Sequence, residues 1–231
     1  MRLIIILAIA AILILAAGAC GQNKAGGAPV ETTMTTRNLP FDTVELVPPD
    51  LARPAPLMQA LKERRSGREH DARPLTLRQL SELLWAANGV NRDNGRRTAP
   101  AAQNQQVVDV YVILPVGIYL YDAPGERLLP VAAGDYRKTA GREEFVTTAP
   151  VNLVYVADPA RFGDPGIPAD EKQNWCCIAV GEMAQNVGLY CAGAQLGNVL
   201  RTVFDRREKL GAALKLQPGA AVILAQTIGA L

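Results

Sequence analysis

The sequence predicts one α+β domain in which helices flank a central, mostly antiparallel sheet. Apolar or β-branched runs at 107–114, 151–157 and 220–228 indicate strands. Apolar residues at helical spacing indicate helices before and between these runs. The strands and helices do not alternate in the regular order of a parallel sheet, and this favours α+β over α/β.

The first 20 residues are predicted to be a lipoprotein-like signal peptide that takes no part in the fold. Arg2 precedes a continuous apolar run at 3–17, which is shorter than the roughly 20 residues of a membrane-spanning helix. The ending Ala17-Gly18-Ala19-Cys20 resembles the lipobox of bacterial lipoproteins, in which the cysteine is lipidated. The alternative is an uncleaved membrane anchor with an incidental cysteine at position 20. Both alternatives predict attachment to a membrane and a location in the bacterial cell envelope, not in the cytoplasm.

Residues 21–50 are predicted to be a flexible tether between the signal peptide and the domain. The segment is rich in Gly, Thr, Pro and Asn and lacks helical or strand periodicity. The folded domain is therefore expected to span 51–231.

The composition argues against several classes of function. Lys and Arg number 24 and Asp and Glu number 22, so the net charge of +2 gives no reason to expect a nucleic-acid partner. His70 is the one histidine of the chain, which argues against a multi-histidine zinc site and against a Ser-His-Asp triad. No metal site is predicted, and His70 itself is expected to lie on the surface.

Two helices are expected to open the domain. Apolar residues at helical spacing predict a short helix over 56–65. Thr76 and Gln79 form a capping-box pattern at the start of the next helix, which Asn88-Gly89 ends. The polar stretch 91–106 follows and is predicted to be a long loop, a kind of segment that is often functional.

The rest of the chain supplies the sheet and its longest helix. The segments 107–114 and 118–121 are expected to pair as a hairpin, and 151–157 and 220–228 add further strands. Between these lie two predicted helices, 171–196 and 206–216; the longer one contains many small residues and is expected to be buried on several sides. Its cysteines, Cys176, Cys177 and Cys191, are expected to be small buried residues; if all lie on one helix they are too far apart to bridge. A disulfide from Cys176 or Cys177 to Cys191 is the alternative.

One cluster of side chains has the chemistry of an anion site. Arg64, Arg65 and Arg68 lie close together with Ser66 among them at the end of the first predicted helix. Arginine suits bidentate phosphate contacts, and the serine adds a hydroxyl donor. Taken alone, such a charged run is more often a solvated face. The sequence shows no phosphate loop, dinucleotide fingerprint or metal-ligand spacing that would offer another site.

Three segments resemble the nitroreductase family, and they occur in the family's order. Leu61–Arg68 resembles its opening motif, Pro74–Gly89 its next helix, and Arg97–Gln106 its flavin loop. Gly117–Asp122 is similar to a segment of the SagB-type thiazole/oxazole-forming dehydrogenase branch. The resemblance covers about residues 57–229 and implies a nitroreductase-like fold.

The resemblance also implies an FMN-dependent oxidoreductase that forms a homodimer with the flavin at the subunit interface. Arg64, Arg65, Ser66 and Arg68 would then hold the phosphate and the ribityl chain. The loop residues that would approach the flavin, often from the partner subunit, are Pro100, Ala101, Ala102 and Asn104. Arg201 and Thr202 stand where the family places backbone donors near the flavin ring. The substrate would be a small molecule or a peptide, and the catalytic residue is not identified.

Two alternatives to an enzyme stay open. The segment before Phe204 lacks the glycine that is usual in the family, and this restricts how closely backbone amides approach a flavin. The protein could therefore be a non-enzymatic ligand- or flavin-binding lipoprotein on a nitroreductase-like fold. In the other alternative, the arginine cluster caps a helix and contacts lipid head groups.

Overall fold

The computed structural model describes residues 34–203 and 206–231. The predicted signal peptide, its Cys20 and most of the first half of the tether lie outside the described residues. Seven strands form one sheet in the order β1-β4-β3-β2-β5-β7-β6, and every pairing is antiparallel. The α+β fold predicted from the sequence is therefore confirmed.

The described elements are these. The strands are β1 (Val44–Glu45), β2 (Val108–Leu114), β3 (Gly117–Asp122), β4 (Arg127–Ala133), β5 (Val151–Ala157), β6 (Leu196–Arg201) and β7 (Ala221–Ala230). The helices are α1 (Leu57–Glu63), α2 (Leu77–Asn88), α3 (Arg137–Ala140), α4 (Glu144–Thr148), α5 (Ala169–Gly193) and α6 (Arg207–Ala213), with 3-10 turns η2 (Ala102–Asn104) and η3 (Pro159–Arg161).

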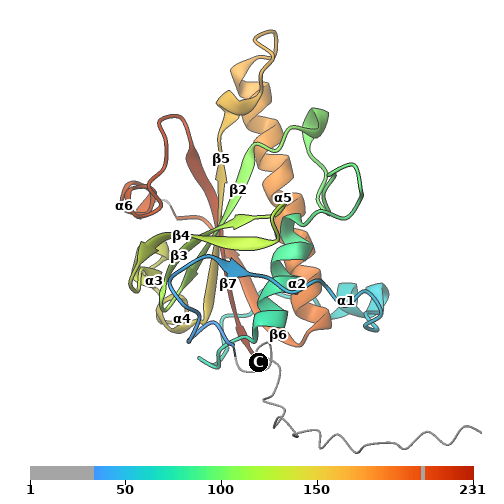
Figure 1. Ribbon diagram of the computed structural model, residues 1–231, viewed down its shortest axis with the longest axis vertical. Coiled ribbons are helices and arrows are strands. Elements are labelled where there is room, and N and C mark those ends of the chain that lie inside the picture. The colour runs from blue at the N-terminus through green and yellow to red at the C-terminus, as the bar shows by residue number, and fades with distance from the viewer. Residues whose placement is uncertain (1–33, 204–205) are drawn as a thin grey trace, which may run out of the picture.

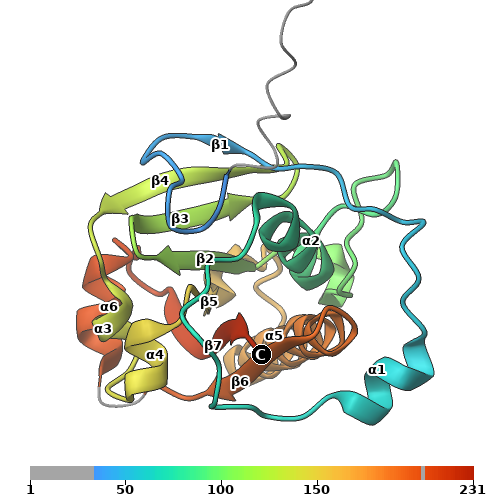
Figure 2. The same ribbon diagram turned by 90° about the horizontal axis from the view of Figure 1, so that it is seen from below.

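Helices cover both faces of the sheet. Figure 1 shows α2 and α5 on one face and α3, α4 and α6 on the other, and Figure 2 shows the same layers from below. In β2, Val110 and Val112 join the core under α2 and α5, whereas Tyr111 and Ile113 join the core on the opposite face. Burial on both faces explains why the sequence of this strand, apart from Asp109, is apolar without alternation. Among the described residues, no helix combines the length and the hydropathy that a membrane span requires.

The segment 34–50 differs from the flexible tether that its composition predicts. Leu39 and Val44 are buried in the main core, and the fully buried Thr36 accepts a hydrogen bond from the backbone N–H of Leu75. Val44–Glu45 forms β1, which pairs with β4 at the edge of the sheet. Two buried apolar residues five positions apart leave no periodicity for sequence reasoning to detect.

The structure contains β4, which the sequence did not predict. This strand includes Pro130, and a proline within a run normally argues against a strand because it cannot donate to the ladder. Proline is tolerated here because the outer neighbour of β4 is β1, whose pairing covers only Leu128 and Arg127. The predicted hairpin is confirmed, since β2 and β3 pair antiparallel around the turn at 115–116.

The capping box predicted at the start of α2 is present. The hydroxyl of Thr76 accepts from the backbone N–H of Gln79, and the Gln79 side chain accepts from the backbone N–H of Thr76. Gly89 ends the helix for a reason of space, because a Cβ there would stand 2.4 Å from Cδ1 of Trp85. The indole of Trp85 lies over this turn and donates to the carbonyl of Val90 at 3.0 Å.

Removing the cap of α2 is expected to destabilise the domain modestly. Thr76→Ala deletes the oxygen that accepts from the N–H of Gln79, a loss that typically costs about 1 kcal/mol. For a domain of this size the melting temperature should fall by about 2–4 °C. Chemical denaturation checks this, with Thr43→Ala, an exposed threonine outside any cap, as the matched control. Equal stability of the two variants would contradict the assigned cap.

The longest helix begins and ends earlier than predicted. α5 spans Ala169–Gly193, and the chain turns through Gln195, whose φ is 57°, directly into β6. The prediction extended the helix to residue 196 and missed β6, because Gly197 and Asn198 are poor strand formers. Cys176, Cys177 and Cys191 all lie on α5 and are free thiols. Cys176 and Cys191 are buried as predicted, but Cys177 is exposed.

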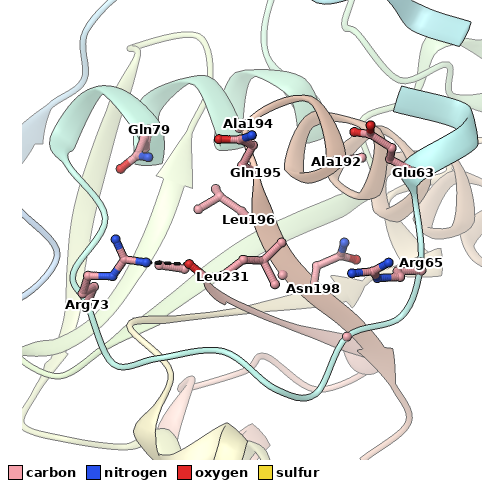
Figure 3. Close-up of a pocket in the computed structure, with 13 residues that line it drawn as sticks. Glu63, Arg65, Arg73, Gln79, Ala192, Ala194, Gln195, Leu196, Asn198 and Leu231 are labelled. Atoms are coloured by element: carbon pink, nitrogen blue, oxygen red, sulfur yellow. Dashed lines mark hydrogen bonds between the residues drawn. The ribbon is translucent and has the colours of Figure 1, made fainter. Parts of the chain in front are cut away.

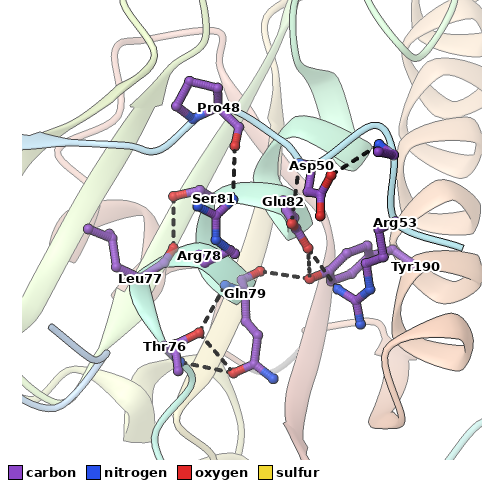
Figure 4. A network of polar contacts seen from close by, with 11 residues as sticks. Pro48, Asp50, Arg53, Thr76, Leu77, Arg78, Gln79, Ser81, Glu82 and Tyr190 are labelled. Carbon is purple, nitrogen blue, oxygen red and sulfur yellow. Dashed lines mark hydrogen bonds and ion pairs between the residues drawn. The ribbon is translucent and has the colours of Figure 1, made fainter. Parts of the chain in front are cut away.

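A buried carboxylate fixes the segment before α1 to the two large helices. Glu82 of α2 has a side chain only 6% exposed, and it pairs with Arg53 at 2.9 Å. It also accepts from the hydroxyl of Tyr190 on α5 at 3.0 Å and from the backbone N–H of Asp50 (Figure 4). Burial and the neighbouring Glu82 raise the pKa of Tyr190, so this phenol stays a donor. The network positions the chain that leads into α1.

Candidate functional site

The predicted arginine cluster lies in an extended segment that runs beside the edge of the sheet. α1 ends at Glu63 with Arg64 as its C-cap, and the chain then continues past β6 and β7 (Figure 2). The N–H of Gly67 donates to the carbonyl of Asn198 at 2.8 Å, and the N–H of Asp71 donates to the carbonyl of Ala230 at 3.0 Å. These two bonds fix the segment 67–71 against the ends of β6 and β7.

A cavity of about 640 Å³ opens next to this segment. Its basic side is formed by Arg65, Gly67 and Arg73 of the segment, and its other walls come from α2, the turn after α5 and the end of β7. Figure 3 shows Arg65 beside Asn198 and Arg73 reaching the main-chain oxygen of Leu231, to which it donates at 2.6 Å. The volume lies within the range of about 300–1,000 Å³ that is usual for small-molecule sites.

The cavity holds positive charge that the protein neutralises only in part. Arg73 pairs with Asp71, whereas Arg65 has no ion-pair partner within 34–203 and 206–231. Glu63 also lines the cavity, and its carboxylate accepts from the side chain of Gln59. The exposed guanidinium of Arg65 is therefore available to an anion.

The structure separates the four residues predicted to hold the phosphate. Arg65 lines the cavity, but the aliphatic part of Arg64 lies against α5, where a Cβ on Gly188 would stand 3.6 Å from it. Ser66 and Arg68 are exposed and do not line the cavity. Arg73 and Asn198 line the same cavity as Arg65, and the sequence did not predict either of them as a site residue. Arg73 lies in a segment without periodicity, and Asn198 lies in the unpredicted β6.

The predicted flavin loop lies on the opposite side of α5 from the arginine segment. Ala101 and Ala102 line a crevice with Ala179 and Met183 of α5. Gly188, which contacts Arg64, follows Ala179 by nine positions. Nine residues make about two and a half helical turns, so the two contacts lie on opposite faces of the helix.

The loop itself has an unusual backbone that leaves its outer residues exposed. Gln103 and Asn104 have φ values of 52° and 56°, in the left-handed region. Pro100, Gln103 and Asn104 are exposed. Within one described chain, Pro100, Ala101, Ala102 and Asn104 therefore do not join the cavity beside Arg65.

Arg201, predicted to lie near the flavin ring, directs its side chain into the second core. Its guanidinium donates to the carbonyl of Ala140 and to the hydroxyl of Thr227, both at 2.9 Å, and lies 5.9 Å from the ring centre of Phe145. Burial lowers the pKa of Arg201, and its bonds connect α3 to β7. Thr202 follows and is exposed. The predicted role concerned backbone donors at these positions, and it stays a prediction.

His70 is half-buried, so the expectation of a surface histidine is wrong. Its ring lies against Gly229, where a Cβ would stand 2.4 Å from Cδ2, and 6.0 Å from the ring of Phe145. Both ring nitrogens are buried and have no hydrogen-bond partner among the described residues. Burial lowers the pKa of His70, although the nearby Asp71 opposes this. The histidine thus packs, in its neutral form, between the arginine segment and the sheet.

The lowered pKa of His70 predicts a loss of stability in mild acid. The unfolded chain takes up the proton more readily than the folded one, so the stabilisation is complete above about pH 6.5 and falls as the pH drops below it. Denaturant unfolding between pH 8 and 5 measures this. His70→Phe keeps a ring in the space and should remove this part of the pH dependence. An identical pH dependence in both proteins would contradict the assignment.

The fold and the site define an α+β protein with a basic cavity at the edge of its sheet. A fully antiparallel sheet is crossed by one long helix, and a basic cavity opens where that helix meets the sheet edge. Residues 61–230 match the model of the Nitroreductase family. The chain therefore belongs to the nitroreductase family, which confirms the family predicted from its ordered motifs.

Known proteins similar to this chain agree with that assignment. A Methanocaldococcus jannaschii protein named "putative nitroreductase" is 33% identical over 172 residues, which cover 68% of this chain and 83% of that protein. A solved structure of the same description from Ralstonia eutropha JMP134 is 43% identical with a TM-score of 0.76, and the match covers 81% of this chain and 89% of that one.

Two more distant solved structures share the fold. The Escherichia coli microcin synthetase McbBCD complex is 18% identical with a TM-score of 0.61, over 73% of this chain and 69% of that chain. A Desulfovibrio desulfuricans protein of the same description as the Ralstonia structure, solved with FMN, is 21% identical with a TM-score of 0.54, over 77% of this chain and 87% of that chain.

Proposed function

We propose that the protein is an FMN-dependent oxidoreductase that binds the flavin phosphate in the cavity beside Arg65. The observation that carries the proposal is the guanidinium of Arg65, which has no ion-pair partner among the described residues and faces a cavity of about 640 Å³ together with Arg73. A phosphate requires several charged or N–H donors, and two guanidinium groups meet that need. Gly67 leaves the approach open, because a Cβ there would have only the Cα of Gly197 within 4.0 Å.

The residues of the cavity have separable tasks in this proposal. Arg65 and Arg73 hold the phosphate, and the side chain of Asn198 offers polar contacts to the rest of the cofactor. Ala192, Ala194 and Leu196 form an apolar wall that limits water at that side of the cavity. A bound flavin supplies the hydride transfer itself, so the protein contributes binding and orientation.

We propose further that two copies of the chain complete the site. The arginine segment and the loop 100–104 lie on opposite faces of α5. In this proposal, each flavin site therefore takes its arginine segment from one chain and its loop from the partner chain. Apolar side chains remain exposed on α1, where Leu57, Met58 and Leu61 are 61%, 76% and 46% exposed. Such a patch is typical of an interface.

The test is flavin retention by the full chain. Protein incubated with FMN and then desalted is expected to keep visible flavin absorbance and to elute as a dimer in light-scattering chromatography. Protein that is colourless after this treatment would refute flavin binding. A monomer that retains FMN would refute only the shared site.

A second measurement separates an enzyme from a non-enzymatic binding lipoprotein. The observation that favours the latter is the segment 200–203 before Phe204, which lacks the glycine usual in the family and ends in the buried Val203. Reduced flavin in the protein is expected to be reoxidised by a quinone or a nitroaromatic acceptor. Bound flavin that does not turn over with either acceptor would favour the binding protein.

The location in the cell envelope is also proposed, from the sequence of residues 1–20 alone. In a bacterial host, the full chain is expected in the membrane fraction, with lipid attached at Cys20. Cys20→Ser should abolish lipid incorporation. Incorporation that persists in the variant would refute the lipidation site, and a chain found in the cytoplasmic fraction would refute export.

A further inference from the structure

A second cavity, separate from the flavin cavity, lies at the other end of the sheet. It measures about 210 Å³ and opens between the end of α2, the loop 91–106, the start of β2 and the end of β3. Figure 1 shows this loop at the right of the molecule, from where it leads into the start of β2. Its lining shares no residue with the cavity beside Arg65.

Three buried polar atoms in this cavity have no hydrogen-bond partner among the described residues. They are Oδ1 of Asn88, Nε of Arg97 and Oε1 of Gln106. Arg97 is only 9% exposed and Asn88 only 6%. Buried polar groups are normally paired, so three unpaired ones around one space indicate that something polar fills it.

Each of the two carboxylates that line the cavity pairs with an arginine other than Arg97. Asp109 pairs with Arg161 at 2.8 Å, and Asp122 pairs with Arg127 at 2.8 Å. Arg97 donates through Nη1 to the carbonyl of Asn88 at 3.0 Å and forms no ion pair within the described part of the chain. Burial lowers the pKa of Arg97, while Tyr121 and Asp122 raise it, and arginine stays charged in any case.

We propose that this cavity binds a small carboxylate. The Nε–Nη2 edge of Arg97 carries no hydrogen bond to a described residue, and this edge matches the two oxygens of a carboxylate. The side-chain amides of Asn88 and Gln106 offer donors to the same group when they turn about their last bond. Val108, Val110 and Leu120 form an apolar wall that suits a short alkyl part.

Acetate is the probe for this site. Titration of acetate into the full chain, at constant ionic strength made up with chloride, is expected to raise the melting temperature by about 3 °C at ten times the dissociation constant. Acetamide has the same shape without the charge and should have no effect. A melting temperature independent of acetate, or equally raised by chloride or acetamide, would overturn the proposal.

Two variants test whether acetate binds in this cavity. Each introduces a carboxylate side chain that would compete with acetate for Arg97. Gln106→Glu places an internal carboxylate beside Arg97 and should weaken acetate binding at least 10-fold; Asn88→Asp should do the same from the end of α2. Gln79→Glu, the same substitution in the flavin cavity, is the matched control and should bind acetate like wild type. Acetate binding that survives in Gln106→Glu and Asn88→Asp would overturn the assignment. The outcome does not depend on flavin binding, which is measured separately by absorbance.

Discussion

Replacing Arg65 by methionine is expected to lower the affinity for FMN by about 10–100-fold and to leave the affinity for riboflavin unchanged. Arg65 is the cavity-lining guanidinium without an ion-pair partner among the described residues, so it is the one most available to a phosphate. A hydrogen bond to a charged group contributes about 1.5–3 kcal/mol, which corresponds to this range of affinities. Riboflavin lacks the phosphate, so its binding isolates the ring and ribityl contacts.

The measurement is quenching of flavin fluorescence on titration with the full chain. Lys209→Met, on the exposed surface of α6, is the matched control for loss of one positive charge and should bind FMN like wild type. Arg68→Met tests whether Arg68 contacts the phosphate, as the family resemblance implies, or lies outside the cavity, as in the structure. The structure leaves Arg68 outside the cavity of its own chain and predicts a smaller effect than for Arg65. Equal loss of FMN and riboflavin affinity in Arg65→Met would show that Arg65 does not contact the phosphate.

Adding one methyl group at Gly229 is expected to destabilise the domain and to weaken FMN binding together. The Cβ of Gly229→Ala would stand 2.4 Å from Cδ2 of His70, closer than atoms pack, so the imidazole has to move. Overpacking of this kind costs about 1–3 kcal/mol. His70 belongs to the segment that Gly67 and Asp71 fix to β6 and β7, so displacement of the ring disturbs the basic side of the cavity as well.

A double-mutant cycle tests this coupling. In His70→Ala the ring is absent, so adding Gly229→Ala to that background should cost much less than in wild type. Denaturant unfolding gives the free energies, and FMN titration shows whether the cavity recovers. Gly163→Ala is the control, because a Cβ there meets nothing within 4 Å. Additive effects of the two substitutions on the free energy of unfolding would mean that the loss of stability in Gly229→Ala does not come from a clash with His70.

The sequence predicted those parts of the fold that local signals specify. The capping box at Thr76, the hairpin at 115–116 and the long helix α5 each have their signal within a few neighbouring residues. Two of the strands that were missed, β4 and β6, depend on partners far along the chain, and their own residues include Pro130 and Gly197. Tertiary pairing decides such strands, so local propensity gives no indication of them.

The candidate site was predictable only in part for the same reason. The arginine cluster was recognised from its sequence, but which arginine faces the cavity depends on how α1 meets α5. Arg64 is turned toward Gly188, while Arg65, one residue later, points into the cavity. Arg73 and Asn198 lie near Arg65 because backbone hydrogen bonds fix the segment 67–71 to β6 and β7. The orphaned polar atoms around Arg97 likewise come from separate elements.

The two faces of α5 have a consequence for genetics. In the proposed dimer each site takes its arginine segment from one chain and its loop from the other. A chain altered at Arg65 and a chain altered at Pro100 would each be defective as homodimers. A mixed dimer of the two would combine both defects in one site and leave the other site wholly wild type. Co-expression of two inactive alleles should therefore restore function, a complementation that a site built within one chain could not give.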